Sequence, residues 1–184
     1  GGYLGEDHPQ IFFYAAQGQQ QARRQAILII PGGGYARVAL QHEGHDVAQV
    51  MAAQGYDAYV LKYRLPKDST MVDKRYGPLQ DAQQALAQIR SFQDYAKVGV
   101  LGFSAGGHLA ASLSTMYSLP QVDHRLSLRP DFAVLLYPVI SMDAKITHRG
   151  SRDNLLGKSP AQADVEQFSM ELQVNHHTPP TFMM

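Results

Sequence analysis

The feature that most constrains the fold is a buried strand that passes through a single serine directly into a helix. Residues 98–103 (VGVLGF) are apolar or glycine throughout, Ser104 follows, and a helical segment rich in small residues extends from about residue 105 to residue 117. A segment that is apolar on both faces is typical of a parallel strand covered on both sides. Parallel strands need crossover connections, usually helices, so this segment predicts an α/β protein.

Other apolar runs alternate with helical patterns along the chain. We expect further strands at 11–15, 26–30, 57–63, 132–140 and 181–184, and further helices at 43–53 and 78–92. Gly55 stands where a glycine commonly ends a helix. The 78–92 helix should bury a stripe made of Leu79, Ala82, Leu86, Ile89 and Phe92. The alternation indicates right-handed βαβ units, and therefore an α/β fold with a doubly wound, mainly parallel sheet and helices on both faces.

We expect one domain over residues 1–184, because neither an internal repeat nor a linker interrupts the chain. Residues 1–25 should hold a polar lead-in, the first strand and a polar turn. Residues 141–178 break the alternation, since they are polar, contain glycine and proline, and lack a long periodic segment. We interpret them as a partly helical excursion over the C-terminal edge of the sheet.

Composition excludes several classes of function. Lys plus Arg equals Asp plus Glu at 16 each, so the net charge is zero and gives no reason to expect binding to nucleic acid or to an anionic membrane. The absence of cysteine rules out disulfides, thiolate zinc sites and a cysteine nucleophile. The longest apolar run, 133–140, is too short to span a membrane. The chain begins with Gly1-Gly2, which suggests a processed or engineered start, and the sequence indicates neither compartment nor oligomeric state.

The segment Gly102-Phe103-Ser104-Ala105-Gly106 matches the pattern G-x-S-x-G between a strand and a helix. In that setting the serine lies on a sharp, strained turn that exposes its hydroxyl, and the two glycines let the backbone pass close to itself. The N-terminus of the new helix then directs free amides, including that of Ala105, toward a developing oxyanion. The alternative is a serine that only caps the helix.

A second glycine-rich segment, Pro31-Gly32-Gly33-Gly34-Tyr35, follows the strand expected at 26–30. Three glycines allow the chain to turn back with its N–H groups facing a site, as the partner half of an oxyanion hole requires. A flexible loop or a phosphate cradle is the alternative, although no Lys-Ser/Thr follows as a P-loop requires. Tyr35 is expected to line the substrate pocket, with simple packing as its other interpretation.

Several histidines lie near these segments. His108 comes four residues after Ser104, one helical turn away and directed along the helix, so we assign it to packing rather than to base catalysis. His42, Glu43 and His45 crowd the start of the 43–53 helix. We interpret them as the polar beginning of that helix rather than as a metal site.

Seven segments, in chain order, carry a resemblance to a known family: AILIIPGGGY, EGHDVAQVMAAQGYDAYVLKYRLP, PLQDAQQAL, VGVLGFSAGGHLAA, LLYPVISM, THRGSRDNLLG and TPPTF. From about residue 26 onward the chain resembles the bacterial acetyl-xylan-esterase-like and lipase/esterase-like branch of the α/β-hydrolases, which is related to the hormone-sensitive-lipase type. The resemblance implies that Ser104 is the nucleophile and that Gly33, Gly34 and Ala105 supply oxyanion-hole amides. It also implies short-acyl ester substrates, among them acetylated saccharides, and no metal or organic cofactor.

The resemblance further implies that two members of the catalytic triad lie elsewhere. These hydrolases order the triad as Ser, then Asp or Glu, then His. In the family the acid follows the strand that begins at TPPTF and the histidine follows the next strand, so both are expected beyond Met184, in a C-terminal part of the fold that these residues lack. Within the chain, Asp143 occupies a position that some relatives use for the acid. The later histidines are His148, His176 and His177. Without a base, Ser104 is a weak nucleophile, so we expect little activity from these residues alone.

The sequence thus supports a serine carboxylic-ester hydrolase that works through an acyl-enzyme, with two alternatives. One is a hydrolase-fold protein that binds a ligand or partner without catalysis, which the missing acid and histidine favour. The other is a peptidase or thioesterase on the same scaffold. The segment 147–157 should lie near the site. If residues 1–184 were the whole polypeptide, the sheet would expose an apolar edge at 181–184 and we would expect association.

Overall fold

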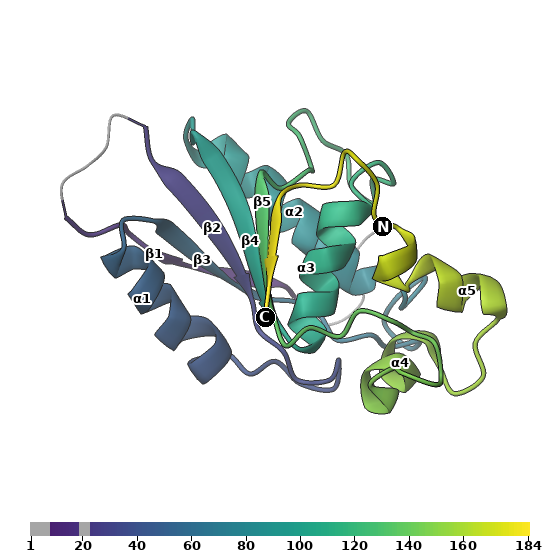
Figure 1. Ribbon diagram of the computed structural model, residues 1–184. Helices are drawn as coiled ribbons and strands as arrows, with labels where there is room; N and C mark the ends of the chain where they lie inside the picture. The colour runs from purple at the N-terminus through teal and green to yellow at the C-terminus, as the bar shows by residue number, and fades with distance from the viewer. Residues whose placement is uncertain (1–7, 19–22) are drawn as a thin grey trace.

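A six-stranded sheet forms the centre of the molecule (Figure 1). The computed structural model describes residues 8–18 and 23–184. The strands are β1 (Gln10–Tyr14), β2 (Gln25–Ile30), β3 (Asp57–Lys62), β4 (Lys97–Phe103), β5 (Phe132–Leu136) and β6 (Thr181–Met183). They follow the order β1-β3-β2-β4-β5-β6 across the sheet. Only β1 runs antiparallel to its neighbour, which confirms a mainly parallel sheet.

Helices cover both faces of this sheet, as the alternation of elements predicts. α1 (Asp46–Ala53) packs on one face, and α2 (Gly77–Phe92) and α3 (Ala105–Thr115) pack on the other (Figure 1). β2 contributes side chains to the cores on both faces, because successive side chains of a strand point to opposite faces of the sheet. Ile27 and Ile29 belong to the core beneath α1, whereas Leu28 and Ile30 belong to the core beneath α2 and α3. The doubly wound arrangement is confirmed.

Several expected elements differ in detail from the structure. The strand expected at 132–140 ends at Leu136, because Tyr137 has a φ of +35° and turns the chain out of the sheet. Phe92, expected in the buried stripe of α2, is 57% exposed at the end of the helix. Its ring stacks on Tyr59 with the centroids 6.0 Å apart. The rest of the expected stripe is buried, namely Leu79, Ala82, Leu86 and Ile89.

The helix expected at 43–53 begins earlier, with a wide π-helical turn, η1 (Gln41–His45). The turn closes with a hydrogen bond of 2.7 Å from the His45 N–H to the Leu40 carbonyl, five residues back. Its end agrees with the sequence, since Gly55 follows α1 with a φ of +96°. Turns of this type occur frequently at functional sites.

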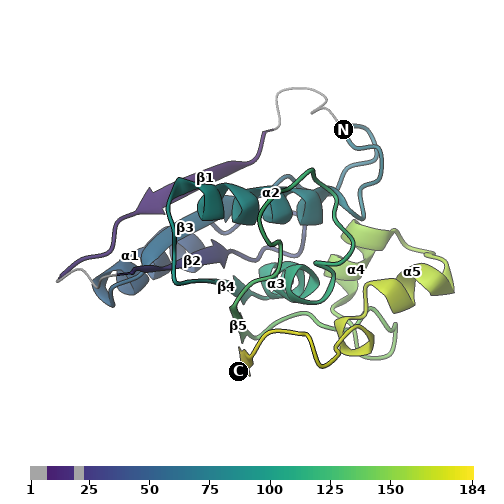
Figure 2. The same ribbon diagram turned by 90° about the horizontal axis from the view of Figure 1, so that it is seen from above.

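The excursion is partly helical, as expected. It contains α4 (Arg149–Leu156), α5 (Gln162–Gln167) and the short η2 (Met170–Leu172). Figures 1 and 2 show α4 and α5 beyond α3, on the side away from α1. Phe168 anchors this region, because it is 1% exposed and meets the Tyr76 ring edge-on at 5.3 Å.

Parts of the expected N-terminal features, residues 1–7 of the lead-in and 19–22 of the polar turn, lie outside the described residues. Within the described ranges, no helix combines the length and apolar character needed to cross a bilayer.

Candidate active site

Ser104 lies alone between the end of β4 and the start of α3, in a strained backbone conformation. Its φ is +53° and its ψ is −120°, a combination that L-residues rarely adopt and that costs about 1–3 kcal/mol. The glycines on either side permit this turn: a Cβ at Gly102 would lie 2.3 Å from the Gly106 carbonyl oxygen, and one at Gly106 would lie 2.2 Å from that of Ile30. The serine side chain makes no capping hydrogen bond to α3, so helix capping does not explain its presence.

The glycine-rich segment 31–35, hereafter the glycine loop, passes directly beside this serine. A Cβ built at Gly32 would lie 3.0 Å from the Cβ of Ser104. Gly33 and Gly34 have φ values of +138° and +66°, which glycine adopts without strain. Within the described residues, their N–H groups have no hydrogen-bond acceptor. Ala105 is the first residue of α3, so its N–H also lacks an intrahelical acceptor.

A cavity of about 450 Å³ opens at Ser104. The excursion and the segment after β5 form its other walls. Its lining consists of Ser104, Tyr137, Pro138, Val139, Ile140, Ser141, Ile146, Thr147, His148 and Glu171. The expectation that segment 147–157 lies near the site is therefore met at Thr147 and His148. The cavity is large enough for a small ester, and the Ser104 side chain is part of its lining.

Tyr35 does not line this cavity, contrary to expectation. Its side chain is 2% exposed, and its hydroxyl forms a 2.7 Å hydrogen bond with Nδ1 of His108. Nε2 of His108 lies 2.8 Å from the Phe168 carbonyl oxygen. Because a carbonyl can only accept, Nε2 carries the proton and Nδ1 accepts from the Tyr35 hydroxyl. His108 is thus a buried packing residue, as the sequence indicates, and it joins the glycine loop to the excursion.

Burial keeps both members of this pair neutral. Desolvation lowers the pKa of His108 to about 4, although its bond to Phe168 and the charge of Glu171 act in the opposite direction. Desolvation also raises the pKa of Tyr35 well above its usual value, with a smaller contribution from Tyr63. The pair is therefore structural at neutral pH, and it offers no base to Ser104.

His148 is the one later histidine that borders the cavity. It caps α4, and its Nδ1 accepts from the Ser151 N–H at 3.2 Å and lies 2.8 Å from the Ser151 hydroxyl. A neutral ring with this arrangement carries its proton on Nε2. His148 consequently presents a donor on its remaining nitrogen, rather than the lone pair that a base for Ser104 would need.

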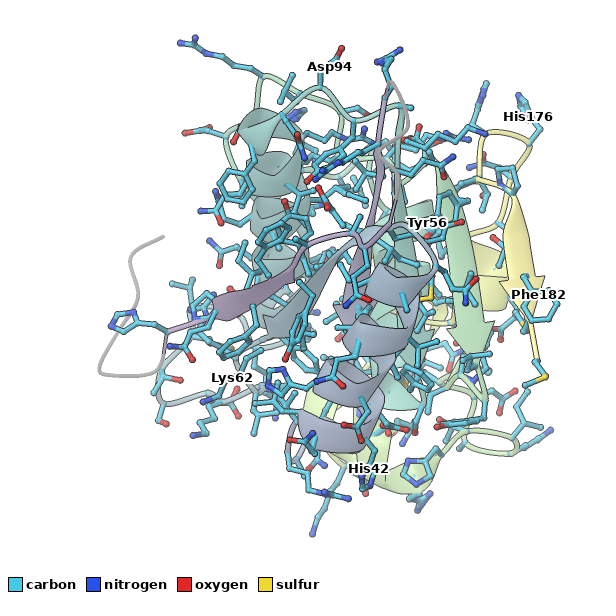
Figure 3. All side chains as sticks on the ribbon, turned by 90° about the vertical axis from the view of Figure 1, so that its left-hand side faces the viewer. His42, Tyr56, Lys62, Asp94, His176 and Phe182 are labelled. Carbon is cyan, nitrogen blue, oxygen red and sulfur yellow. The ribbon has the colours of Figure 1, made fainter. Side chains whose placement is uncertain are left out.

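The other residues considered for an in-chain triad are placed less favourably still. Asp143 is exposed, and its carboxylate accepts the Lys145 N–H in a local turn. His176 and His177 precede β6, so they lie where the parallel strands begin, whereas Ser104 lies where β4 ends. Figure 3 shows His176 at the opposite end of the sheet from His42, which belongs to η1. These two histidines are too far along the strands to serve Ser104.

Three residues that sequence reasoning missed tie the site together. Glu43 accepts the Gly32 N–H through Oε1 at 3.0 Å and the Tyr137 hydroxyl through Oε2 at 2.7 Å. The Asn154 side-chain amide donates to the Gly34 carbonyl at 2.8 Å. Asn154 belongs to the quoted segment THRGSRDNLLG, which was the available signal. Glu43 and Tyr137 likewise belong to quoted segments, EGHDVAQVMAAQGYDAYVLKYRLP and LLYPVISM, and these were the available signals.

The strained serine at the end of a central parallel strand, next to a glycine loop, defines an α/β-hydrolase. The BD-FAE family model matches residues 12–184. The chain belongs to this family.

Individual relatives agree with that assignment. An acetylxylan esterase of Xylanibacter ruminicola is 37% identical over 166 residues, which are 84% of this chain and 32% of that protein. Endo-1,4-beta-xylanase B of Butyrivibrio fibrisolvens is 35% identical over 95% of this chain and 28% of its own length. The crystal structure of an acetyl ester-xyloside bifunctional hydrolase from Caldicellulosiruptor lactoaceticus superposes with a TM-score of 0.83 at 37% identity. That match covers 95% of this chain and 65% of the other. The chain thus spans about a third of these curated relatives.

No group of three or more histidine, aspartate or glutamate side chains that could hold a metal ion occurs in the described parts of the chain. In particular, His45 is engaged with the Tyr14 hydroxyl at 2.7 Å.

Proposed function

We propose that Ser104 is the nucleophile of a carboxylic-ester hydrolase that forms an acyl-enzyme. The observation that carries the proposal is the strained backbone of Ser104, which lines a cavity and lies beside the glycine loop. Strain of this kind persists only where the surrounding structure enforces it, and it commonly marks catalytic groups.

In the proposed reaction, Ser104 Oγ attacks the ester carbonyl carbon while its proton passes to a general base. The carbonyl oxygen becomes an oxyanion, which the amides of Gly33, Gly34 and Ala105 stabilise. Collapse of this intermediate breaks the ester bond, and the leaving alcohol takes a proton. Water then attacks the acyl-enzyme by the same steps and releases the acid and free Ser104.

The proposed substrates are short-acyl esters, with acetylated saccharides as the favoured group. The cavity of about 450 Å³ suits a small acyl group, and two of the relatives are an acetylxylan esterase and an acetyl ester-xyloside bifunctional hydrolase. Because the hydrogen bonds of His148 leave no lone pair for Ser104, we expect slow turnover by residues 1–184 alone.

The test is covalent labelling of the longest natural form of the protein with a fluorophosphonate, read by intact mass, because phosphonylation needs the same general base as acylation. We expect one adduct per chain on Ser104, none in Ser104→Ala, and unchanged labelling in Ser118→Ala, which alters an exposed serine just after α3. An unlabelled wild-type chain would refute the nucleophile assignment and favour a ligand-binding hydrolase fold. Acetylated xylo-oligosaccharides, an acetyl thioester and a peptide anilide then distinguish esterase from thioesterase and peptidase.

A further inference from the structure

Glu43 connects two walls of the candidate site that are far apart in the sequence. Its carboxylate accepts the Gly32 N–H with one oxygen and the Tyr137 hydroxyl with the other. Gly32 is close to both this carboxylate and Ser104. A Cβ built on Gly32 would lie 2.9 Å from Glu43 Oε1 and 3.0 Å from Ser104 Cβ. Tyr137 is part of the lining of the Ser104 cavity. One side chain therefore contacts both the glycine loop and the segment after β5.

The local fold places Glu43 there for identifiable reasons. Gly44 is buried, and a Cβ on it would lie 2.9 Å from Val60 Cγ1 and 3.3 Å from the Pro31 ring. The missing side chain lets η1 pack directly on the start of the glycine loop. The wide turn of η1 then directs the preceding residue, Glu43, toward Gly32. A regular first helical turn would rotate this side chain to another direction, because it advances the chain by 3.6 residues per turn.

We propose that Glu43 is a positioning residue, which holds the glycine loop at the separation from Ser104 that oxyanion binding requires. The proposal rests on the function proposed above. Gly32 immediately precedes the two amides expected to bind the oxyanion, so a hydrogen bond to its N–H fixes the orientation of the peptide planes that follow. The bond to Tyr137 fixes the carboxylate in turn.

The role of Glu43 is geometric rather than electrostatic. A negative carboxylate close to a developing oxyanion raises the energy of that oxyanion, so its charge gives no direct benefit to the reaction. What the carboxylate supplies is two acceptor oxygens held in a fixed orientation. A glutamine can reproduce this arrangement, since its oxygen accepts from Gly32 and its amide donates to the Tyr137 oxygen. The proposal therefore predicts that Glu43→Gln behaves like the unaltered chain.

The kinetic test measures the rate of Ser104 phosphonylation by a fluorophosphonate in the longest natural form of the protein, as a function of probe concentration. For Glu43→Ala we expect the limiting rate to fall about 10- to 100-fold with little change in apparent probe affinity, because displaced donors affect the transition state rather than initial binding. Tyr137→Phe should show a smaller loss, and Glu43→Gln should restore the rate to within about threefold. Asp46→Ala, an exposed acidic residue of the next helical turn, is the matched control.

A second readout does not depend on chemistry at Ser104. In amide NMR spectra, Glu43→Ala should speed hydrogen exchange at Gly32 and shift the Gly33 and Gly34 signals, whereas Glu43→Gln should not. Unmoved signals in Glu43→Ala, a normal labelling rate in that variant, or an equal loss in Asp46→Ala would each overturn the inference. If the unaltered chain is not labelled at all, the proposed function fails, and the NMR comparison still decides whether Glu43 holds the loop.

Discussion

At the scale of single residues, the Ser104 backbone shows a conflict between stability and chemistry. Its φ of +53° with ψ of −120° is a conformation that glycine adopts easily and that a side chain makes costly. A glycine would therefore be the most stable residue at this position, and the serine is retained against that preference. Strain of this kind clusters at functional sites, and the nucleophile role proposed for Ser104 accounts for it.

This argument gives a stability prediction. Ser104→Gly should be more stable than Ser104→Ala by about 1 kcal/mol or more, because only glycine relieves the positive φ. Both variants remove the hydroxyl, so neither should be labelled by a fluorophosphonate. Urea denaturation of the two variants measures the difference. Equal stabilities would mean that the turn is not strained, and the argument from strain to function would then fail.

At the scale of elements, the buried ring of His108 links α3, the glycine loop and the segment between α5 and η2. It lies on α3, accepts from Tyr35 of the glycine loop, and donates to Phe168 between α5 and η2. The unfolded chain binds a proton at this histidine below about pH 6.5, whereas the folded protein does so only below about pH 4, because burial lowers the pKa. The unfolding free energy should therefore fall as the pH drops through this window and be fully retained above it.

A variant isolates this contribution from the other titrating groups. Between pH 7 and pH 5, the drop in unfolding free energy should be smaller in His108→Gln than in the unaltered chain by about 2 kcal/mol, since 1.5 pH units below the unfolded pKa correspond to about that much. Glutamine can still donate to the Phe168 carbonyl. Denaturant titrations at the two pH values provide the measurement, and an identical drop in both proteins would contradict the assignment of a neutral His108.

The strands and helices could be predicted from sequence because burial on both faces leaves few interpretations for an apolar run such as 26–30. The sharp turn at Ser104 could be predicted because β4 can pass directly into α3 only with glycines on either side of the serine. Contacts across the site could not be predicted from the sequence, since Glu43 and Tyr137 are 94 positions apart and Asn154 and Gly34 are 120 positions apart. The sequence also could not predict the role of Tyr35, because an aromatic ring fits both a pocket wall and a core. Its hydrogen bond to His108, which only the structure reveals, places it in the core.

At the scale of the whole molecule, the sheet ends in two unlike edges. β1 closes one edge as an antiparallel strand (Figure 1). At the other edge, β6 is a short strand with exposed side chains. Phe182, Met183 and Met184 are 60%, 56% and 75% exposed. Beside β6, an open cavity of about 540 Å³ is bordered largely by apolar residues, including Leu135, Ile140 and Met183. Apolar surface on an unpaired strand favours pairing with another chain.

A polypeptide limited to residues 1–184 is therefore expected to self-associate through β6. Static light scattering should give a mass above 20.3 kDa that rises with concentration. Phe182→Lys should weaken association about tenfold or more, because burying a lysine at the contact costs over about 1.4 kcal/mol. Val72→Lys, at a 95% exposed position in the loop before α2, should leave the mass unchanged. A monodisperse 20.3 kDa species at all concentrations would show that the β6 edge tolerates solvent, because its short length presents too few backbone groups to pair.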